Sequence, residues 1–512
     1  SLDYTVGYQA TEESYRRLSA GETNFTNPDQ VYLNTGNTTS ENSNPDSYNA
    51  LTRQNGGYAV LDFTIYDNLL VQVSGRAESL STLPGAGVIF YPSGSIGYKI
   101  TDLIGSDAVN FAKIRASYGE VGIGANPYAT STVYGPGGIF SSWGDGLGGY
   151  LYGNPFTQSA SRGNPNLKEE RKSETEFGLD LRMFDNAITL NATYYENETN
   201  DGIIALPIPA STGFTTTLQN AATISNKGFE LDLTARLIRT DDFGVSVNAN
   251  YTQNRNLVVD LKGSAYSILN GFTSTSSGIA EGYPFAVLRS GVYEKDASGN
   301  YVLNANGFPN AASEQEVGVG DPNADFRAGF GVNIYYKNLS LTSVVETSQG
   351  NDVWNGTYGV LNYFGIHEDT AIKNVNDTGA TIVNSAGTEI PAGATFRGYI
   401  EDFGGGPVAV DSEWWTTNGG GFGDVGEPFI MDGSWIKMRE VSLTYNFTEA
   451  FVKNLGLSNL TLSVSGRNLF LWSAIDGFDP ENNLTGASRG RGLEYFSNPG
   501  TSSFLTTLRL QF

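Results

Sequence analysis

The chain lacks cysteine altogether and has a single histidine, His367, among its 512 residues. Without cysteine it can form no disulfide framework, no thiolate metal site and no thiol nucleophile. Long hydrophobic runs are missing as well, because no stretch approaches the roughly 18 consecutive apolar residues that a membrane-spanning helix requires. These absences exclude helical membrane spans and any chemistry that needs a thiol.

Positive charge is also scarce in this sequence. The chain has 30 Lys and Arg residues against 54 Asp and Glu residues, which gives a formal net charge of -24 at pH 7. Nucleic-acid backbones and anionic membrane surfaces attract clusters of Lys and Arg, and the sequence has no such clusters. We therefore expect no nucleic-acid partner.

The residues that are abundant favour strands and turns. The chain has 63 Gly, 28 Tyr and 28 Phe but only three Met, a composition typical of β-strands joined by turns. The mean hydropathy of -0.25 does not separate a soluble β protein from a membrane barrel, because alternate residues of a barrel strand face a wet lumen. We expect an all-β chain.

The last ten residues form a strand with one apolar face. Except for Thr506, the side chains on that face are large and apolar, at the alternate positions Phe504, Leu508, Leu510 and Phe512. Chain ends of soluble proteins are usually polar and frayed, whereas a membrane barrel needs a final strand that pairs and also faces lipid. The end of the chain therefore favours a membrane barrel.

The strand predicted for residues 228–238 shows which face would meet lipid. Its apolar residues Phe229, Leu231, Leu233, Ala235 and Leu237 alternate with Glu230, Asp232, Thr234 and Arg236. An Arg or Lys on the lipid face at the bilayer midplane costs about 2–4 kcal/mol. We therefore expect the charged face to line the lumen.

Connection lengths in the sequence alternate between short and long. We predict tight turns at Asp67-Asn68, Asp185-Asn186 and Lys337-Asn338, and about fourteen strands in all. Between strands lie long stretches rich in Gly, Asn, Ser and Thr, at residues 19–57, 122–170, 260–282 and 351–433. This pattern predicts an antiparallel transmembrane β-barrel with short periplasmic turns and long extracellular loops.

Four stretches of the sequence carry a family resemblance. The first three are NPNLKEERKSETEFGLD at residues 164–180, the segment at residues 209–231, and GVGDPN at residues 318–323. The fourth combines DGSWIKMR at 432–439, SGRNLF at 465–470 and GFDPE at 477–481. In this order they resemble the SusC/RagA-like TonB-dependent transporters of Bacteroidota. Their Gly, Asn, Asp and Pro residues favour an architectural role, because such residues supply unusual backbone angles and local caps.

The resemblance implies a domain organisation. Residues 1–512 are expected to be the C-terminal part of a plugged barrel of roughly 22 strands. The signal peptide, N-terminal β-sandwich, TonB-binding segment and plug of the family are not recognisable in this sequence. The terminal residues Phe504, Leu510 and Phe512 are similar to the closing strand that the barrel assembly machinery reads.

The resemblance also implies a function. It implies TonB-dependent import of a nutrient, a glycan or an oligopeptide, across the outer membrane together with a SusD-like lipoprotein. The TonB complex would act through the absent N-terminal segments, and outer-membrane lipid would surround the barrel. A transporter-like barrel that serves a structural or secretion complex without TonB-driven import remains an alternative.

Candidate contact residues are aromatic. Trp143, Trp414 and Trp415 lie in predicted loops and are candidates to stack on a glycan or to anchor the lipoprotein, but the region of Trp414 also resembles a loop motif of the family, which favours loop packing there. An enzyme is not expected, because no G-x-S-x-G nucleophile motif occurs and a lone loop histidine such as His367 is usually solvated. The acidic clusters at 296–300 and 321–325 lack the spacing of an EF-hand, so we expect no metal or other cofactor.

Overall fold

The computed structural model describes residues 1–19, 46–136, 156–272, 274–454, 456–475, 477–486 and 490–512. One large sheet contains the long strands, and each pairs with the next long strand along the chain. The hydrogen-bonded order is β1 (Leu2–Ser19), β2 (Asp46–Ile65), β3 (Leu69–Leu80), β4 (Ile89–Lys99), β5 (Val109–Ile123), β9 (Glu170–Met183), β10 (Ile188–Pro207), β11 (Thr216–Arg239), β12 (Phe243–Asp260), β17 (Phe326–Tyr336), β18 (Leu339–Gln349), β27 (Trp435–Asn446), β28 (Asn459–Ser473) and β30 (Ser503–Gln511). The short β8 (Ser161–Arg162) pairs with β11 in parallel.

The chain divides into two compact units, which are described separately. Unit 1 comprises residues 1–98, 115–175 and 197–224, and unit 2 comprises residues 99–114, 176–196 and 225–512. The strand order confirms the predicted all-β fold of about fourteen antiparallel strands. In the described part of the chain, no helix has the length and apolar character needed to cross a membrane.

Unit 1 is built on the long hairpin of β1 and β2. All 18 residues of β1 pair with β2, from Leu2 opposite Phe63 to Ser19 opposite Asp46. The prediction that residues 19–57 form one long loop is therefore wrong at its C-terminal end, because β2 begins at Asp46. Smaller elements of this unit are β6 (Tyr134–Pro136), β7 (Phe156–Gln158) and the 3-10 helix η2 (Ala210–Thr212).

The predicted tight turns are present, with one shift. Lys337 and Asn338 form a two-residue turn between the paired residues Tyr336 and Leu339, and Asp185-Asn186 also forms a tight turn. The first turn is centred on Tyr66 and Asp67, both with positive φ, rather than on Asp67-Asn68. Positive φ at both central residues matches the twist of a hairpin.

The strands of unit 2 have one apolar and one polar face. Between β12 and β17 the register sets Val245 opposite Ile334 and Val247 opposite Val332, while Ser246 lies opposite Asn333. A shift of one residue would mix the two faces, so the alternating sequence specifies this register. The terminal strand β30 follows the same rule, since Leu508 and Leu510 lie opposite Leu462 and Leu460.

The long connections of unit 2 contain regular structure, which the sequence prediction missed. The connection between β12 and β17 contains a four-stranded sheet of β13 (Ser267–Phe272), β14 (Thr275–Ile279), β15 (Val287–Ser290) and β16 (Glu316–Gly320). The connection between β18 and β27 contains short strands, short helices and 3-10 turns. They are β19 (Asp352–Asn355), α2 (Gly356–Tyr363), η3 (Glu368–Ala371), β20 (Lys373–Val375), β21 (Ile382–Val383), β22 (Glu389–Ile390), β23 (Thr395–Arg397), β24 (Tyr399–Glu401), β25 (Val408–Val410), α3 (Ser412–Trp415), η4 (Glu427–Phe429) and β26 (Ile430–Asp432). These elements are too short for hydrophobic periodicity to reveal them.

Three further elements complete unit 2. They are α1 (Thr101–Ile104), α4 (Glu449–Asn454) and β29 (Leu493–Glu494). The last pairs with β19 in parallel, next to the antiparallel partner β26. Residues near the end of the chain are thereby fixed to the connection between β18 and β27.

Candidate functional site

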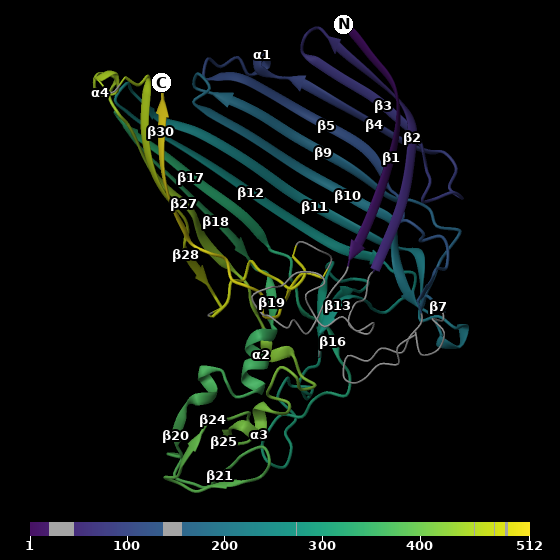
Figure 1. The fold of residues 1–512 in the computed structure, drawn as a ribbon, viewed down its shortest axis with the longest axis vertical. Coiled ribbons are helices and arrows are strands. Elements are labelled where there is room, and N and C mark those ends of the chain that lie inside the picture. Colours follow the sequence, from purple (N-terminus) through teal and green to yellow (C-terminus); the bar gives the residue numbers. More distant parts are fainter. Residues whose placement is uncertain (20–45, 137–155, 273, 455, 476, 487–489) are drawn as a thin grey trace, which may run out of the picture. The chain divides into compact units, whose positions relative to one another are not determined.

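The candidate site lies in the long connections of unit 2. Figure 1 shows that α2, α3 and the short strands β20, β21, β24 and β25 gather beyond the ends of the long strands of this unit. They are held together by a buried cluster of seven side chains: Tyr293, Phe308, Val408, Val410, Trp414, Trp415 and Val425. Burial of this many aromatic and branched side chains stabilises a segment that has few hydrogen bonds of regular structure.

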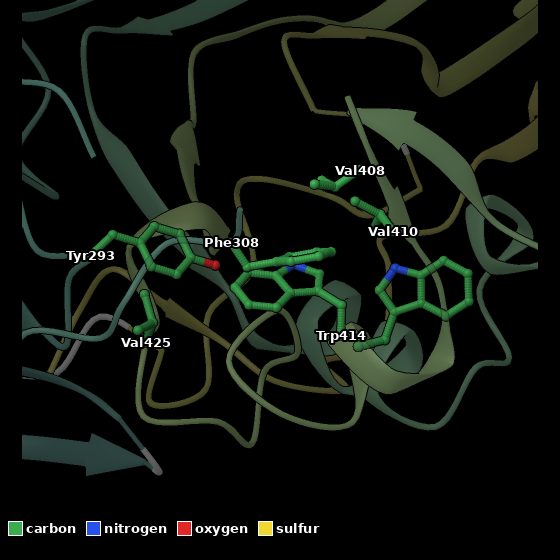
Figure 2. Close-up of a cluster of buried hydrophobic side chains, with 7 residues drawn as sticks. Tyr293, Phe308, Val408, Val410, Trp414 and Val425 are labelled. Atoms are coloured by element: carbon green, nitrogen blue, oxygen red, sulfur yellow. The ribbon is translucent and has the colours of Figure 1, made fainter. Parts of the chain in front are cut away.

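Trp414 lies at the centre of this cluster (Figure 2). Its ring centroid is 4.9 Å from that of Phe308 and 6.0 Å from that of Tyr293, and it stacks on Tyr293 at an interplanar angle of 22°. A Cβ added at Gly419 would come within 2.2 Å of the Trp414 indole. Trp414 and Trp415 are 7% and 4% exposed, so packing accounts for most of their surface.

The short helix α3 positions both tryptophans. Asp411 precedes the helix and its Oδ1 accepts a hydrogen bond from the backbone N–H of Glu413 at 3.0 Å. Its other oxygen, Oδ2, accepts one from the Asn384 side-chain amide at 2.8 Å. An aspartate in this position satisfies an N–H group that the helix leaves unpaired. Asp411 therefore ties the start of α3 to the segment around β21.

A cavity of about 520 Å³ lies beside this cluster, and we call it the aromatic cavity. Its walls are formed by eight aromatic side chains, three carboxylates and four other residues: Tyr293, Tyr301, Tyr358, Tyr399, Phe403, Phe429, Trp414, Trp415, Asp369, Glu401, Glu427, Asn362, Ile372, Gly419 and Pro428. No Lys or Arg is among these described lining residues. The volume is in the range of small-molecule binding sites.

Hydrogen bonds and burial keep the tyrosines of the aromatic cavity protonated. Tyr358 donates its hydroxyl proton to Asp369 Oδ2 at 2.9 Å, and burial together with this carboxylate raises the pKa of Tyr358 to about 12. Burial also raises the pKa of Tyr293, whose hydroxyl donates to Asn418 O at 3.0 Å. The cavity therefore combines flat apolar faces with carboxylate acceptors, a surface that suits a hydroxyl-rich ring.

A second cavity, of about 550 Å³, lies where the long strands of unit 2 meet their connections. Residues of β12, β17, β18 and β27 line it, and residues 480–483, 486, 491 and 492 contribute to its wall. It contains three arginines, Arg327, Arg439 and Arg491, and we call it the arginine cavity. The registers set Thr252 opposite Arg327 and Arg327 opposite Ser348, so these three lining residues share one face of the sheet.

The fourth sequence motif comes together beside the arginine cavity. Lys437 Nζ lies 2.9 Å from Asp479 Oδ2 and 2.8 Å from Glu481 Oε2. Arg439 pairs with Glu481 and, at 2.6 Å, with Glu346. The segments 432–439 and 477–481 are thus joined by ion pairs across some forty residues of chain. These ion pairs give two segments of the motif a structural task, which is to attach a connection to β27.

The remaining candidates from the sequence are Trp143 and the acidic clusters. Trp143 lies outside the described residues, so its predicted role is neither supported nor contradicted. Asp296 accepts the backbone N–H groups of Ser298 and Asn300 at 2.8 Å and 3.0 Å, an arrangement that shapes a turn. Across the described ranges, no group of three or more His, Cys, Asp or Glu residues could hold a metal ion.

The sequence did not predict most residues of the aromatic cavity as site residues. Tyr301, Tyr358, Tyr399 and Asp369 are scattered over some hundred residues and follow no motif. The only signal was the local density of aromatic residues in stretches otherwise rich in Gly and Asn. Their convergence depends on the packing of short strands that periodicity cannot predict.

The fold defines a class of protein. Long antiparallel strands in chain order, with polar and apolar faces and alternating short and long connections, are the architecture of an outer-membrane β-barrel. A family model described as TonB dependent receptor-like, beta-barrel matches residues 1–365. The chain belongs to this family, whose members are outer-membrane transport proteins.

Curated relatives agree with this assignment. TonB-dependent receptor P3 of Formosa agariphila is 26% identical over 455 residues, which are 83% of this chain and 42% of the relative. TonB-dependent receptor SusC of Bacteroides thetaiotaomicron is 25% identical over 456 residues, 82% of this chain and 40% of SusC. The chain therefore spans less than half the length of these two relatives. Both organisms are Bacteroidota, as the sequence resemblance implied.

A solved structure shares the fold. The structure of the RagAB peptide transporter aligns with a TM-score of 0.73 at 19% identity, over 100% of this chain and 53% of that chain. At this identity the likeness establishes the fold and not the ligand. The prediction of a SusC/RagA-like β-barrel is confirmed.

Proposed function

We propose that the chain is the C-terminal barrel portion of an importer that takes up a glycan or an oligopeptide together with a SusD-like lipoprotein. The TonB complex would drive uptake through segments that precede residue 1 in the full-length protein. The names of the relatives support this proposal, because one is SusC and a structural neighbour is titled a peptide transporter.

The aromatic cavity is the observation that carries the proposal. It lies in the connections beyond the strand ends, where loops of an outer-membrane barrel meet the external medium. Tyr301 is 38% exposed and lines the cavity, whereas Trp414 and Trp415 are buried behind its surface. We therefore assign substrate stacking to Tyr301, while the two tryptophans hold the wall in place.

Uptake by living cells tests this function. The gene is deleted in its host and complemented with the full-length wild type, with Tyr301→Ala or with Phe364→Ala. Phe364 serves as the control, because it is an exposed aromatic of the other long connection of unit 2, between β18 and β27, and does not line the cavity. Fluorescently labelled neutral oligosaccharides and oligopeptides are supplied with and without a protonophore.

We expect wild type and Phe364→Ala to restore uptake of one substrate class, and the protonophore to abolish it. Tyr301→Ala should lower uptake at an unchanged amount of protein in the outer membrane. Uptake that the deletion leaves unchanged would refute the importer. A deletion that instead impairs secretion of surface proteins would favour a structural or secretion component. Co-purification of a lipoprotein with the complemented protein tests the partner.

A further inference from the structure

The arginine cavity has polar walls built from two sources. The strands contribute side chains such as Asn250, Thr252 and Arg327, and the connections contribute Asn351 and Asn482. At about 550 Å³ it is larger than a single ion needs and fits a small oligomer. Its chemistry differs from that of the aromatic cavity, which has carboxylates and no cation among its lining residues.

The carboxylates of the arginine cavity are already engaged by protein groups. Glu481 binds both Arg439 and Lys437, and the hydrogen bonds from Arg439 lower the pKa of Glu481 to about 2. Glu346 accepts a hydrogen bond from Arg439 Nε at 2.6 Å. Asp352 Oδ2 accepts the backbone N–H of Asp321 at 2.8 Å. Two of these three acidic groups are thus neutralised by Arg439 and Lys437.

Arg327 and Arg491 are different, because neither forms an ion pair with a carboxylate of the described residues. Asp325, two residues from Arg327, is paired with Arg255 at 2.6 Å. Arg491 donates only to a neutral acceptor, Asn323 Oδ1, at 3.2 Å, and its guanidinium lies over the Phe285 ring at 5.9 Å from the centroid.

The surroundings of Arg491 compensate its charge only in part. Partial desolvation lowers the pKa of Arg491 and the nearby charge of Arg327 lowers it further, while the charge of Asp321 acts in the opposite direction. Two like charges brought to one cavity destabilise each other unless an anion lies between them. Different strand pairings hold the two arginines in place. Arg327 is on β17 in the large sheet, whereas Arg491 precedes β29, which pairs with β19.

We propose that the arginine cavity binds a carboxylate group of the imported substrate between Arg327 and Arg491. Guanidinium groups present N–H donors in a planar fork that matches the two oxygens of a carboxylate. The field of a chain with net charge -24 repels anions at long range, so recognition would depend on these short hydrogen bonds. This inference rests on the proposed function, and it assigns the substrate an acidic group from a uronic acid or a peptide terminus.

Binding to the complete protein, purified in detergent, tests the inference by isothermal titration calorimetry. Trigalacturonate is compared with the neutral trisaccharide maltotriose, and trialanine with its C-terminal amide, so that a sugar source and a peptide source are distinguished. The variants are Arg327→Gln, Arg491→Gln and the control Arg467→Gln. Arg467 carries the same charge but pairs with Glu440 outside the cavity.

We expect the acidic member of at least one pair to bind more tightly than its neutral partner. Each cavity variant should weaken that binding about tenfold or more, the loss typical of a charged hydrogen bond, and Arg467→Gln should not. Unchanged affinity in both cavity variants, an equal loss in the control, or equal binding of acidic and neutral members would overturn the proposal. If Arg491→Gln fails to fold, as judged by heat-modifiable mobility in electrophoresis, the exposed Arg327 decides the result.

The binding measurement also separates this inference from the proposed function. It needs no energised membrane, so carboxylate binding by a protein that imports nothing would refute the importer and leave the site intact. Protonophore-sensitive uptake of neutral substrates with no preference for a carboxylate would refute the site and leave the importer intact.

Discussion

At the scale of single residues, the ion pairs beside the arginine cavity attach a connection to a strand. The side chains of Lys437 and Asp479 are 6% and 7% exposed, so both charges have lost nearly all their water. The attraction within such a pair roughly offsets the cost of desolvation. The pair is therefore better understood as a device that fixes where residues 477–481 attach than as a large source of stability.

Glu481 gives this attachment a pH dependence. Its pKa is about 2 in the folded chain and 4.5 ordinarily, so the ionised form is favoured by folding. The corresponding stabilisation is complete above about pH 4.5 and is lost as the pH falls towards about 2. Glu481→Gln removes this titration. We predict that the wild type loses more thermal stability than the variant between about pH 6 and pH 3, measured by circular dichroism in detergent; parallel curves would contradict this.

At the scale of the elements, glycines on one strand make room for tyrosines on the next. Gly244 lies opposite Tyr335 in the β12–β17 register, and Gly7 lies opposite Tyr58 in the β1–β2 register. A Cβ at Gly244 would come within 2.1 Å of the Tyr335 ring. The ring covers the glycine, an arrangement that protects a strand position with no side chain of its own.

Replacing Gly244 therefore tests the importance of these pairs. Tyr335 cannot swing away freely, because its hydroxyl donates to Thr240 O at 2.6 Å. Gly244→Ala should destabilise the fold by about 1–3 kcal/mol through overpacking, measured as a lower unfolding midpoint in denaturant. The control is Gly57→Ala, whose added Cβ would meet only Gly7 O at 3.9 Å. A control as destabilised as Gly244→Ala would show that strand glycines matter for another reason.

Irregular strand positions explain two segments of the fourth sequence motif. Around Arg439 the register shifts on both sides of β27, and on β28 Asn468 has a φ of 50°. A β-bulge of this kind re-aims a side chain, and here Arg439 reaches both Glu346 and Glu481. The sequence SGRNLF at 465–470 thus marks a bulge, with Asn at the position where positive φ is tolerated.

At the scale of the whole molecule, one face of the strands must meet lipid. We assign the face of Leu233 to lipid and that of Asp232 to the lumen. Leu233→Arg would place a charge in the bilayer at a cost of about 2–4 kcal/mol near the midplane. Asp232→Asn keeps a polar group in a wet lumen. We predict that the first variant lowers the amount of folded protein in the outer membrane far more than the second, and equal tolerance would refute the assignment.

The terminal strand supplies a second prediction about assembly. Phe504 and Phe512 are 79% and 90% exposed, and Leu510 is 47% exposed, although β30 is fully paired with β28 on one side. Apolar side chains left outside the fold in this way are available to an assembly machine and to lipid. Deleting Phe512 should reduce insertion, measured as folded protein per cell by heat-modifiable electrophoresis. An undiminished yield would count against this role, and Phe512→Tyr serves as the conservative control.

The sequence by itself determined most of the long strands, the alternation of side chains along them and two of the three predicted tight turns. These are local properties: alternation sets which side chains share a face, and residues such as Lys337-Asn338 set the turn between neighbours. The family motifs fixed the class of protein as well. Because each long strand pairs with the next one in the chain, local information was sufficient for this part of the fold.

The two cavities were decided only by the tertiary structure. Asp479 and Glu481 form ion pairs with Lys437 and Arg439 across some forty residues. Arg491 and Arg327 line one cavity although more than a hundred and sixty residues separate them. No period or spacing encodes such encounters, since they follow from how short, irregular connections pack on one another. The partners of Trp414, among them Tyr293 and Phe308, were likewise visible only in the tertiary structure.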